Sequence, residues 1–218
     1  MNIACLLFHE VHELNVIGPY SVLIAASRRL GDEPVEPGTE DADVAAADFP
    51  AEEARQPKLN VFTVAKSRNS VETSGGLVIT PHRTFASAPP PDIMIVPGGR
   101  GIEAAIRDKP LRGYLERLEP QLQLLASVST GALLLGEMGL LKDMRATTWA
   151  GQLNRLKDYE PGEIVDARVV KNPNGVWCSG GVSAGIDLGL ELVSDFFAPE
   201  LAREIAIELN YPFWSPQT

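Results

Sequence analysis

Cysteine and histidine are scarce in this sequence of 218 residues, which contains two cysteines and three histidines. Both cysteines, Cys5 and Cys178, lie inside apolar runs, so we predict that they are buried as small hydrophobic residues. A disulfide scaffold is therefore not expected, and the cysteine content is typical of a protein from a reducing compartment.

Long apolar runs are also missing, since no segment approaches the roughly 18 to 20 consecutive apolar residues of a membrane-spanning helix. The apolar start, residues 2–8, has neither the basic residues nor the cleavage site of a signal peptide and is predicted to be a strand. With 44% hydrophobic and 22% charged residues, the chain is expected to fold in water as one domain covering residues 1–218. We expect a cytoplasmic protein with no membrane partner.

Lysine and arginine are fewer than aspartate and glutamate, which gives a formal net charge of −10. This charge disfavours nucleic acid as a partner. Residues 31–57 hold nine acidic residues against Arg55 alone and so carry −8 of that charge. The segment also contains four prolines and few large apolar residues, which predicts a solvated surface insertion between a first helix and a second strand. A lid or a partner-binding element is the alternative.

Short β-rich runs alternate with helical patterns over the rest of the chain, which predicts an α/β fold with a mostly parallel sheet. Runs that are apolar throughout predict strands covered on both faces, at residues 3–8, 60–65, 93–97 and 124–128. Weaker strand signals occur at residues 77–80, 167–170 and 175–178. The last two flank an Asn-Pro-Asn-Gly turn that predicts a hairpin.

Helices are predicted at residues 19–29, 101–118 with a break near Pro110, 130–138 and 199–209. A further helix is predicted near residues 182–197, because apolar residues recur there at spacings of three and four. Gly185 and Gly189 share one face of that helix and would allow a neighbouring element to approach closely.

Two turns at the ends of predicted strands are candidates for the functional site, because ligands of parallel α/β sheets bind beyond the carboxyl ends of the strands. In the first, a strand runs into Gly98 and Gly99, whose amides a ligand can approach. In the second, Ser129 occupies the tip of a strand-to-helix turn, with Thr130 next to it. Amides of Thr130 and of a glycine could together stabilise an oxyanion, although small residues after a strand are also ordinary turn chemistry.

Five motifs resemble, in order and spacing, the ThiJ/PfpI superfamily of class I glutamine amidotransferase-like proteins. They occupy residues 92–99, 127–131, 138–141, 145–148 and 180–187. The resemblance covers nearly the whole chain except the acidic insertion, and it is strongest to isonitrile hydratases and to the sensing domains that precede AraC-type DNA-binding modules. It implies a flavodoxin-like three-layer α/β/α sandwich, a homodimer, and a cysteine nucleophile assisted by a carboxylate, with no cofactor and no metal.

The sequence departs from that pattern at three positions. Ser129 stands where the family has its cysteine, Asn15 stands where isonitrile hydratases have an aspartate, and Trp149 stands where relatives commonly have a histidine. A serine hydroxyl is much less acidic than a thiol and needs a positioned general base, which an asparagine cannot provide. Three changed positions favour natural divergence over an engineered replacement of one cysteine.

His12 or His9 could replace the missing base, and Glu13 or Glu10 the missing aspartate, because their turn is expected at the same edge of the sheet as Ser129. Solvated side chains in a polar turn are the simpler interpretation. The favoured hypothesis is a catalytically degenerate protein that binds a small molecule or has a regulatory role. The alternative is a hydratase or hydrolase that works through Ser129, and a transcriptional sensor would need a separate DNA-binding chain.

Overall fold

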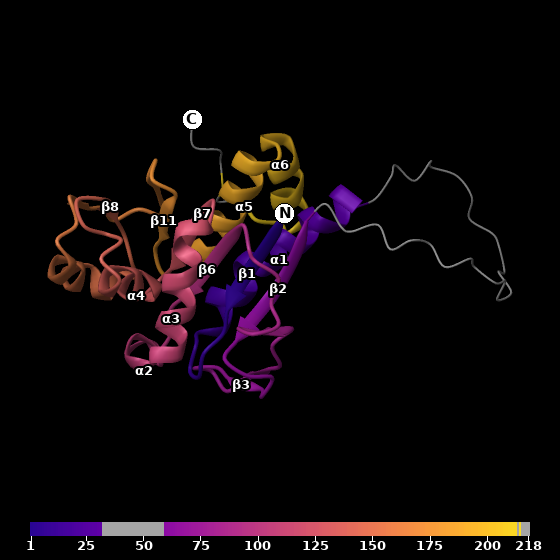
Figure 1. Cartoon of the computed structure of the whole chain (residues 1–218). Coiled ribbons are helices and arrows are strands. Elements are labelled where there is room, and N and C mark those ends of the chain that lie inside the picture. Colours follow the sequence, from indigo (N-terminus) through magenta and orange to yellow (C-terminus); the bar gives the residue numbers. More distant parts are fainter. Residues whose placement is uncertain (32–58, 213, 215–218) are drawn as a thin grey trace, which may run out of the picture.

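The computed structural model describes residues 1–31, 59–212 and 214, and these form a mixed sheet between two layers of helices (Figure 1). Seven strands are hydrogen-bonded in the order β10-β11-β7-β6-β1-β2-β5. All neighbours are parallel except β10 and β11. The predicted α/β class and three-layer architecture are therefore confirmed, while the acidic insertion lies outside the described residues.

The four central strands are those that the apolar runs predicted: β1 (Asn2–Leu6), β2 (Asn60–Ala65), β6 (Ile93–Pro97) and β7 (Leu124–Val128). Every residue of β6 and β7 is buried, as expected for strands covered by helices on both faces. Cys5 and Cys178 are buried in this sheet, as predicted, and burial raises the pKa of the Cys5 thiol to about 12.

Helices α1 (Glu13–Gly31), α5 (Ala184–Phe196) and α6 (Pro199–Glu208) pack together as one layer. The predicted start of the first helix at Pro19 was wrong, because α1 begins six residues earlier and contains Pro19 in its interior. A Cβ at Gly185 would lie 3.1 Å from the ring of Pro19, and one at Gly189 would lie 2.9 Å from Cβ of Val22. The two glycines thus let α5 approach α1 closely, as predicted.

The second helical layer contains α2 (Ile102–Arg107), α3 (Lys109–Leu118) and α4 (Gly131–Glu137). The predicted break near Pro110 lies at Asp108, whose carboxylate accepts a hydrogen bond of 3.1 Å from the amide of Leu111 and caps α3. Two segments are 3₁₀-helical, η1 (Glu119–Gln121) and η2 (Ala150–Tyr159), and the second packs against α4.

The remaining strands are short. The predicted hairpin consists of β10 (Val169–Lys171) and β11 (Val176–Ser179), with Gly175 at φ 79° in its turn. The predicted strand at residues 77–80 is β4 (Val78–Ile79), which pairs with β3 (Val71–Glu72) outside the main sheet. The sequence did not predict β3, β5 (Arg83–Thr84), β8 (Arg145–Ala146) or β9 (Glu163–Ile164).

Two buried carboxylates of α5 bind the segment that follows α6. Asp187 accepts a 2.8 Å hydrogen bond from the hydroxyl of Tyr211, and Glu191 accepts one of 2.9 Å from the indole of Trp214. Each carboxylate is also paired with a cation: Arg168 lies 2.5 Å from Asp187, and Lys171 lies 2.6 Å from Glu191. We call these six residues the C-terminal clasp.

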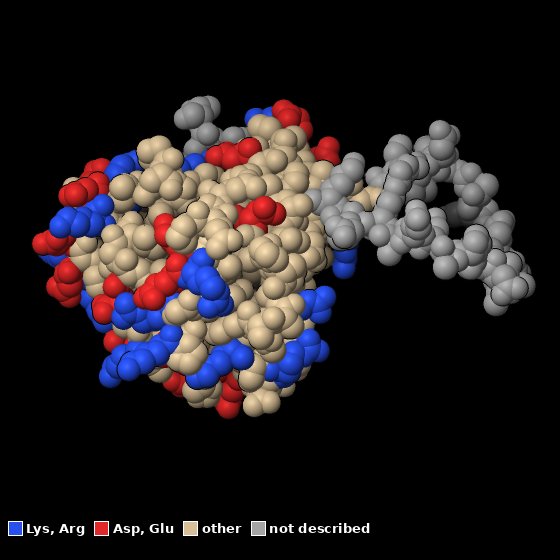
Figure 2. Space-filling model, in the orientation of Figure 1, with Lys and Arg blue, Asp and Glu red and all other residues tan. Residues whose placement is uncertain are grey.

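Charged side chains of both signs lie on the surface shown in Figure 2, and lysine and arginine are more numerous over the part that carries α2 and β3. The described body thus lacks the strong acidic character of residues 31–57. Among the described residues, no helix has the length and apolar character needed to cross a membrane.

Candidate functional site

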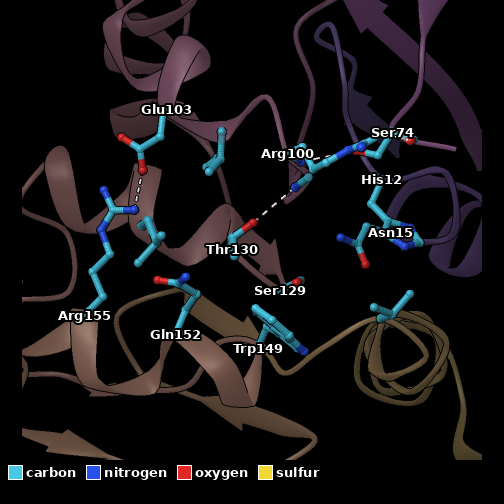
Figure 3. Close-up of a pocket in the computed structure, with 14 residues that line it drawn as sticks. His12, Asn15, Ser74, Arg100, Glu103, Ser129, Thr130, Trp149, Gln152 and Arg155 are labelled. Carbon is cyan, nitrogen blue, oxygen red and sulfur yellow. Dashed lines mark hydrogen bonds and ion pairs between the residues drawn. The ribbon is translucent and has the colours of Figure 1, made fainter. Parts of the chain in front are cut away.

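A cavity of about 610 Å³ opens beyond the carboxyl ends of β1, β6 and β7, where the sequence predicted the site (Figure 3). Its wall is formed by the turn before α1, the glycine turn after β6, the turn after β7 and the segment that enters η2. The lining residues are His12, Asn15, Ser74, Gly99, Arg100, Ile102, Glu103, Ser129, Thr130, Leu133, Trp149, Gln152, Arg155 and Val182.

Ser129 occupies the sharp turn between β7 and α4 and has a left-handed backbone conformation, with φ 58°. Its amide donates to the carbonyls of Ser179 and Gly180, at 3.0 and 3.1 Å, and its carbonyl accepts a 2.7 Å hydrogen bond from the hydroxyl of Thr148. These bonds hold a conformation that is unfavourable for a residue with a Cβ. Ser129 is 5% exposed and lines the cavity.

The Ser129 hydroxyl makes no hydrogen bond within the described residues. His12 also lines the cavity, but its Nδ1 atom accepts a 3.3 Å hydrogen bond from the amide of Leu14 at the start of α1. The carboxylate of Glu13 binds the amide of Gly75 at 3.1 Å. The structure therefore gives neither His12 nor Glu13 the contact with Ser129 that a general base requires.

A hydrogen bond from its own backbone amide, with further ones from the Gly75 amide and the Thr73 side chain, lowers the pKa of the Glu13 carboxyl against the opposing effect of burial. This carboxylate thereby fixes the 73–76 turn beside α1. Glu13 binds the amide of Gly75 and not Ser129, so this structure does not place it as a replacement for the missing aspartate.

Asn15 lies in the first turns of α1 and is 1% exposed. Its Nδ2 atom donates a 3.1 Å hydrogen bond to the carbonyl of Gly98, which also accepts a 2.9 Å bond from the amide of His12. The other atom of the carboxamide, Oδ1, is buried and has no hydrogen-bond donor among the described residues. Asn15 thus ties α1 to the glycine turn and leaves one acceptor unpaired at the cavity.

The amides expected to form an oxyanion site differ in their availability. The amide of Gly99 is occupied, since it donates a 3.1 Å hydrogen bond to the hydroxyl of Thr130. The amides of Gly98 and Thr130 donate no hydrogen bond within the described part of the chain. A Cβ at Gly98 would lie 2.5 Å from the amide nitrogen of Thr130 and 2.8 Å from that of Gly131, so only glycine allows the two turns to approach this closely.

Arg100 and Ser74 form a rim of the cavity that the sequence did not predict. The Arg100 guanidinium donates to the carbonyl of Ser74, and the Arg100 amide donates a 3.2 Å hydrogen bond to the Ser74 hydroxyl. That hydroxyl in turn donates a 2.6 Å bond to the carbonyl of Glu10, which has φ 58°. The rim combines the β3–β4 turn with the glycine turn, two segments whose contact no local pattern indicates.

Trp149 is 47% exposed and borders the cavity at the start of η2. Its indole lies in a slot made by two glycines: a Cβ at Gly151 would lie 2.7 Å from its Cη2 atom, and one at Gly181 would lie 3.2 Å from Cγ. The ring packs against glycine backbone at two places, and its exposed part remains available as an apolar surface. Trp149 therefore contributes apolar area to the cavity where the family resemblance implied an imidazole.

The outer end of the cavity carries an ion pair between Arg155 of η2 and Glu103 of α2 (Figure 3). A hydrogen bond from Arg155, together with the charges of Arg155 and Arg107, lowers the pKa of Glu103. Glu103 is therefore an ionised, paired carboxylate, and it would make a poor proton acceptor for Ser129. No group of three or more potential metal ligands occurs among the described residues.

Comparisons with known proteins agree with this architecture. The sequence profile of the DJ-1/PfpI family matches residues 34–195. Isonitrile hydratase of Pseudomonas putida is 32% identical over 215 residues, which cover 97% of this chain and 78% of that protein. The HTH-type transcriptional regulator GbdR of Pseudomonas aeruginosa is 27% identical over 66% of this chain, and the match covers 39% of the regulator.

Solved structures show the same fold. A THiJ/PfpI family protein from Pseudomonas syringae superposes with a TM-score of 0.78 at 24% identity, covering 100% of this chain and 77% of the other. Oxidized DJ-1 of Toxoplasma gondii gives a TM-score of 0.72 at 19% identity, with coverage of 97% and 99%. At these identities the structures support the fold, while the isonitrile hydratase supports the relationship in sequence.

Proposed function

Since this chain belongs to the DJ-1/PfpI family and is related to isonitrile hydratase, we propose that it binds a small neutral molecule in the cavity at Ser129 without converting it. The cavity has the size of a small-molecule site, and its wall combines polar side chains with the apolar surface of residues such as Leu133 and Trp149. A binding or regulatory role follows from this combination.

The observation that carries the proposal is the isolation of the Ser129 hydroxyl. A serine becomes a nucleophile when a neighbouring base removes its proton, and within the described residues this hydroxyl has no hydrogen-bonded acceptor. Asn15 contributes a carboxamide, which does not accept protons at neutral pH. Glu103, which is the one carboxylate lining the cavity in the described part of the chain, is paired with Arg155.

The backbone around Ser129 favours a second candidate function. Its left-handed conformation is that of a nucleophile elbow, and Ser129 lines the cavity. A hydratase or hydrolase that works through Ser129 would use this geometry. It would still require a base, such as His12, to approach the hydroxyl when substrate is bound.

Both candidates are tested by assaying the purified chain with cyclohexyl isonitrile, following product by chromatography and binding by calorimetry. We expect no turnover by the chain itself or by Ser129→Ala. Turnover that Ser129→Ala abolishes would contradict the binding proposal. The double variant Ser129→Cys with Asn15→Asp supplies a thiol and a carboxylate. Activity in this variant alone would support the hypothesis that the cavity is an enzyme site that has lost its catalytic groups.

A homodimer is the second part of the proposal. It is supported by two large hydrophobic side chains on the outer side of α1, Leu14 and Ile17, which are more than one third exposed. Sedimentation equilibrium should give twice the chain mass, and Leu14→Asp with Ile17→Asp should shift the equilibrium to the monomer. A monomer at micromolar concentration would contradict this part alone.

A further inference from the structure

A second hollow, of about 560 Å³, borders the cavity at Ser129, and we call it the α5 groove because it lies at the start of that helix. The groove is lined by Leu14 and by residues of three segments, 148–150, 166–168 and 180–184. Of the described residues, Trp149 and Val182 are the two that line both the cavity and the groove. These two side chains therefore form the wall between them.

The backbone around Trp149 holds its indole in this wall. The residue before it, Thr148, donates a 2.7 Å hydrogen bond to the carbonyl of Ser129. A Cβ at Gly151 would lie 2.7 Å from Cη2 of the indole, and one at Gly181 would lie 3.2 Å from its Cγ atom. A side chain at either glycine would displace the ring, so the ring occupies a place that the surrounding backbone leaves for it.

The charges of the cavity favour the Trp149 side for an apolar part of a ligand. Figure 3 shows the ion pair of Glu103 and Arg155 on the side of the cavity away from Trp149. Trp149 and Val182 offer apolar surface instead. A neutral ligand whose polar group lies at Ser129 can bury an apolar tail against the indole without taking the charged pair out of water.

We infer that Trp149 is a specificity-determining residue, whose indole closes the cavity toward the α5 groove and so limits the length of the apolar tail that a ligand can carry. This inference rests on the proposed binding function and specifies which neutral molecules the cavity selects. Removal of the indole would join the cavity to the groove and let a longer tail enter it.

The test compares n-alkyl isonitriles from ethyl to octyl by calorimetric titration of the full chain. Each methylene group that becomes buried should raise the affinity about fourfold until the tail reaches Trp149, and beyond that length the gain should stop. In Trp149→Ala, short members should bind more weakly because they lose the contact with the ring, but the gain should continue to the longer members. The same limiting length in both proteins would overturn the inference.

A second variant keeps the indole and moves it. Gly151→Ala would place a methyl group 2.7 Å from Cη2 of Trp149, so the ring must shift and the limiting length should change. Gly113→Ala in α3 is the matched control, because a Cβ there would meet no atom of the described residues within 4 Å, and it should keep the original limit. An unchanged limit in Gly151→Ala would count against the indole as the wall, even if Trp149→Ala does not fold.

The outcomes separate the inference from the function on which it rests. If no isonitrile of the series binds to the unmodified chain, the proposed binding function fails together with the inference. If the series binds and the affinity rises up to octyl in the unmodified chain, the binding function stands and the inference alone is overturned.

Discussion

The C-terminal clasp allows a quantitative test of the buried charges, through the substitution Lys171→Met. Glu191 is 1% exposed, and the ammonium group of Lys171 lies 2.6 Å from its Oε2 atom. That oxygen accepts no hydrogen bond of regular geometry within the described residues, so its attraction to Lys171 is that of an ion pair. The substitution removes the cation and leaves a buried carboxylate whose remaining donor is the indole of Trp214, at 2.9 Å.

Loss of one partner of a buried ion pair costs about 3–5 kcal/mol, because the other charge stays buried without compensation. We take the lower end, about 3 kcal/mol, since Trp214 continues to donate and the Lys171 side chain is 21% exposed. For a chain of this size, 1 kcal/mol corresponds to roughly 2–4 °C, so the melting temperature should fall by roughly 6–12 °C.

The assay is thermal unfolding followed by circular dichroism, with Lys142→Met as the matched control. Lys142 pairs with Glu160 at a similar distance, 3.0 Å, but both side chains are mostly exposed, so its replacement should leave the unfolding midpoint almost unchanged. The double variant Lys171→Met with Glu191→Gln removes both charges and should regain part of the lost stability. If Lys171→Met destabilises no more than Lys142→Met, the reasoning about buried charge is wrong.

Three further predictions concern the cavity and the clasp. Gly98→Ala should weaken small-molecule binding in the cavity by about tenfold or more with little loss of secondary structure, because its methyl group would lie 2.5 Å from the amide nitrogen of Thr130; calorimetry and circular dichroism check this. Trp149→Ala should weaken binding and remove most of the ligand-induced change in tryptophan fluorescence, and an unchanged affinity would argue against contact with the indole. Burial and the hydrogen bond to Asp187 raise the pKa of Tyr211 to about 12, so the protein loses stability between about pH 10 and 12, and Tyr211→Phe should make that loss shallower in pH-dependent melting.

The prediction of the fold succeeded where burial alone decides the structure. The strands at residues 60–65, 93–97 and 124–128 coincide with β2, β6 and β7, because a strand covered on both faces must be apolar throughout. The start of α1 could not be located in this way. Proline is common in the first turn of a helix, but Pro19 lies in the interior of α1, against the glycines of α5. Two-residue strands such as β5 carry too few residues for any periodicity.

The backbone turns that line the cavity could be predicted from the sequence, but the hydrogen bonds and ion pairs between its side chains could not. The turn at Ser129 and the glycines after β6 follow from strand ends, and the family resemblance drew attention to Asn15, which lines the same cavity. The occupied amide of Gly99 depends on how the Thr130 side chain rotates, which no spacing determines. Arg155 and Glu103 meet across 52 positions of sequence, and no local pattern shows that pairing.

The parallel direction of the central strands bears on how this protein could be attached to a surface. Met1 immediately precedes β1, while His12 of the cavity follows that strand's other end. Five residues of strand span about 17 Å, so the first residue and the cavity lie at opposite edges of the sheet. A linker at the amino terminus would therefore present the cavity to solvent, which suits a sensor chip coated with oriented molecules.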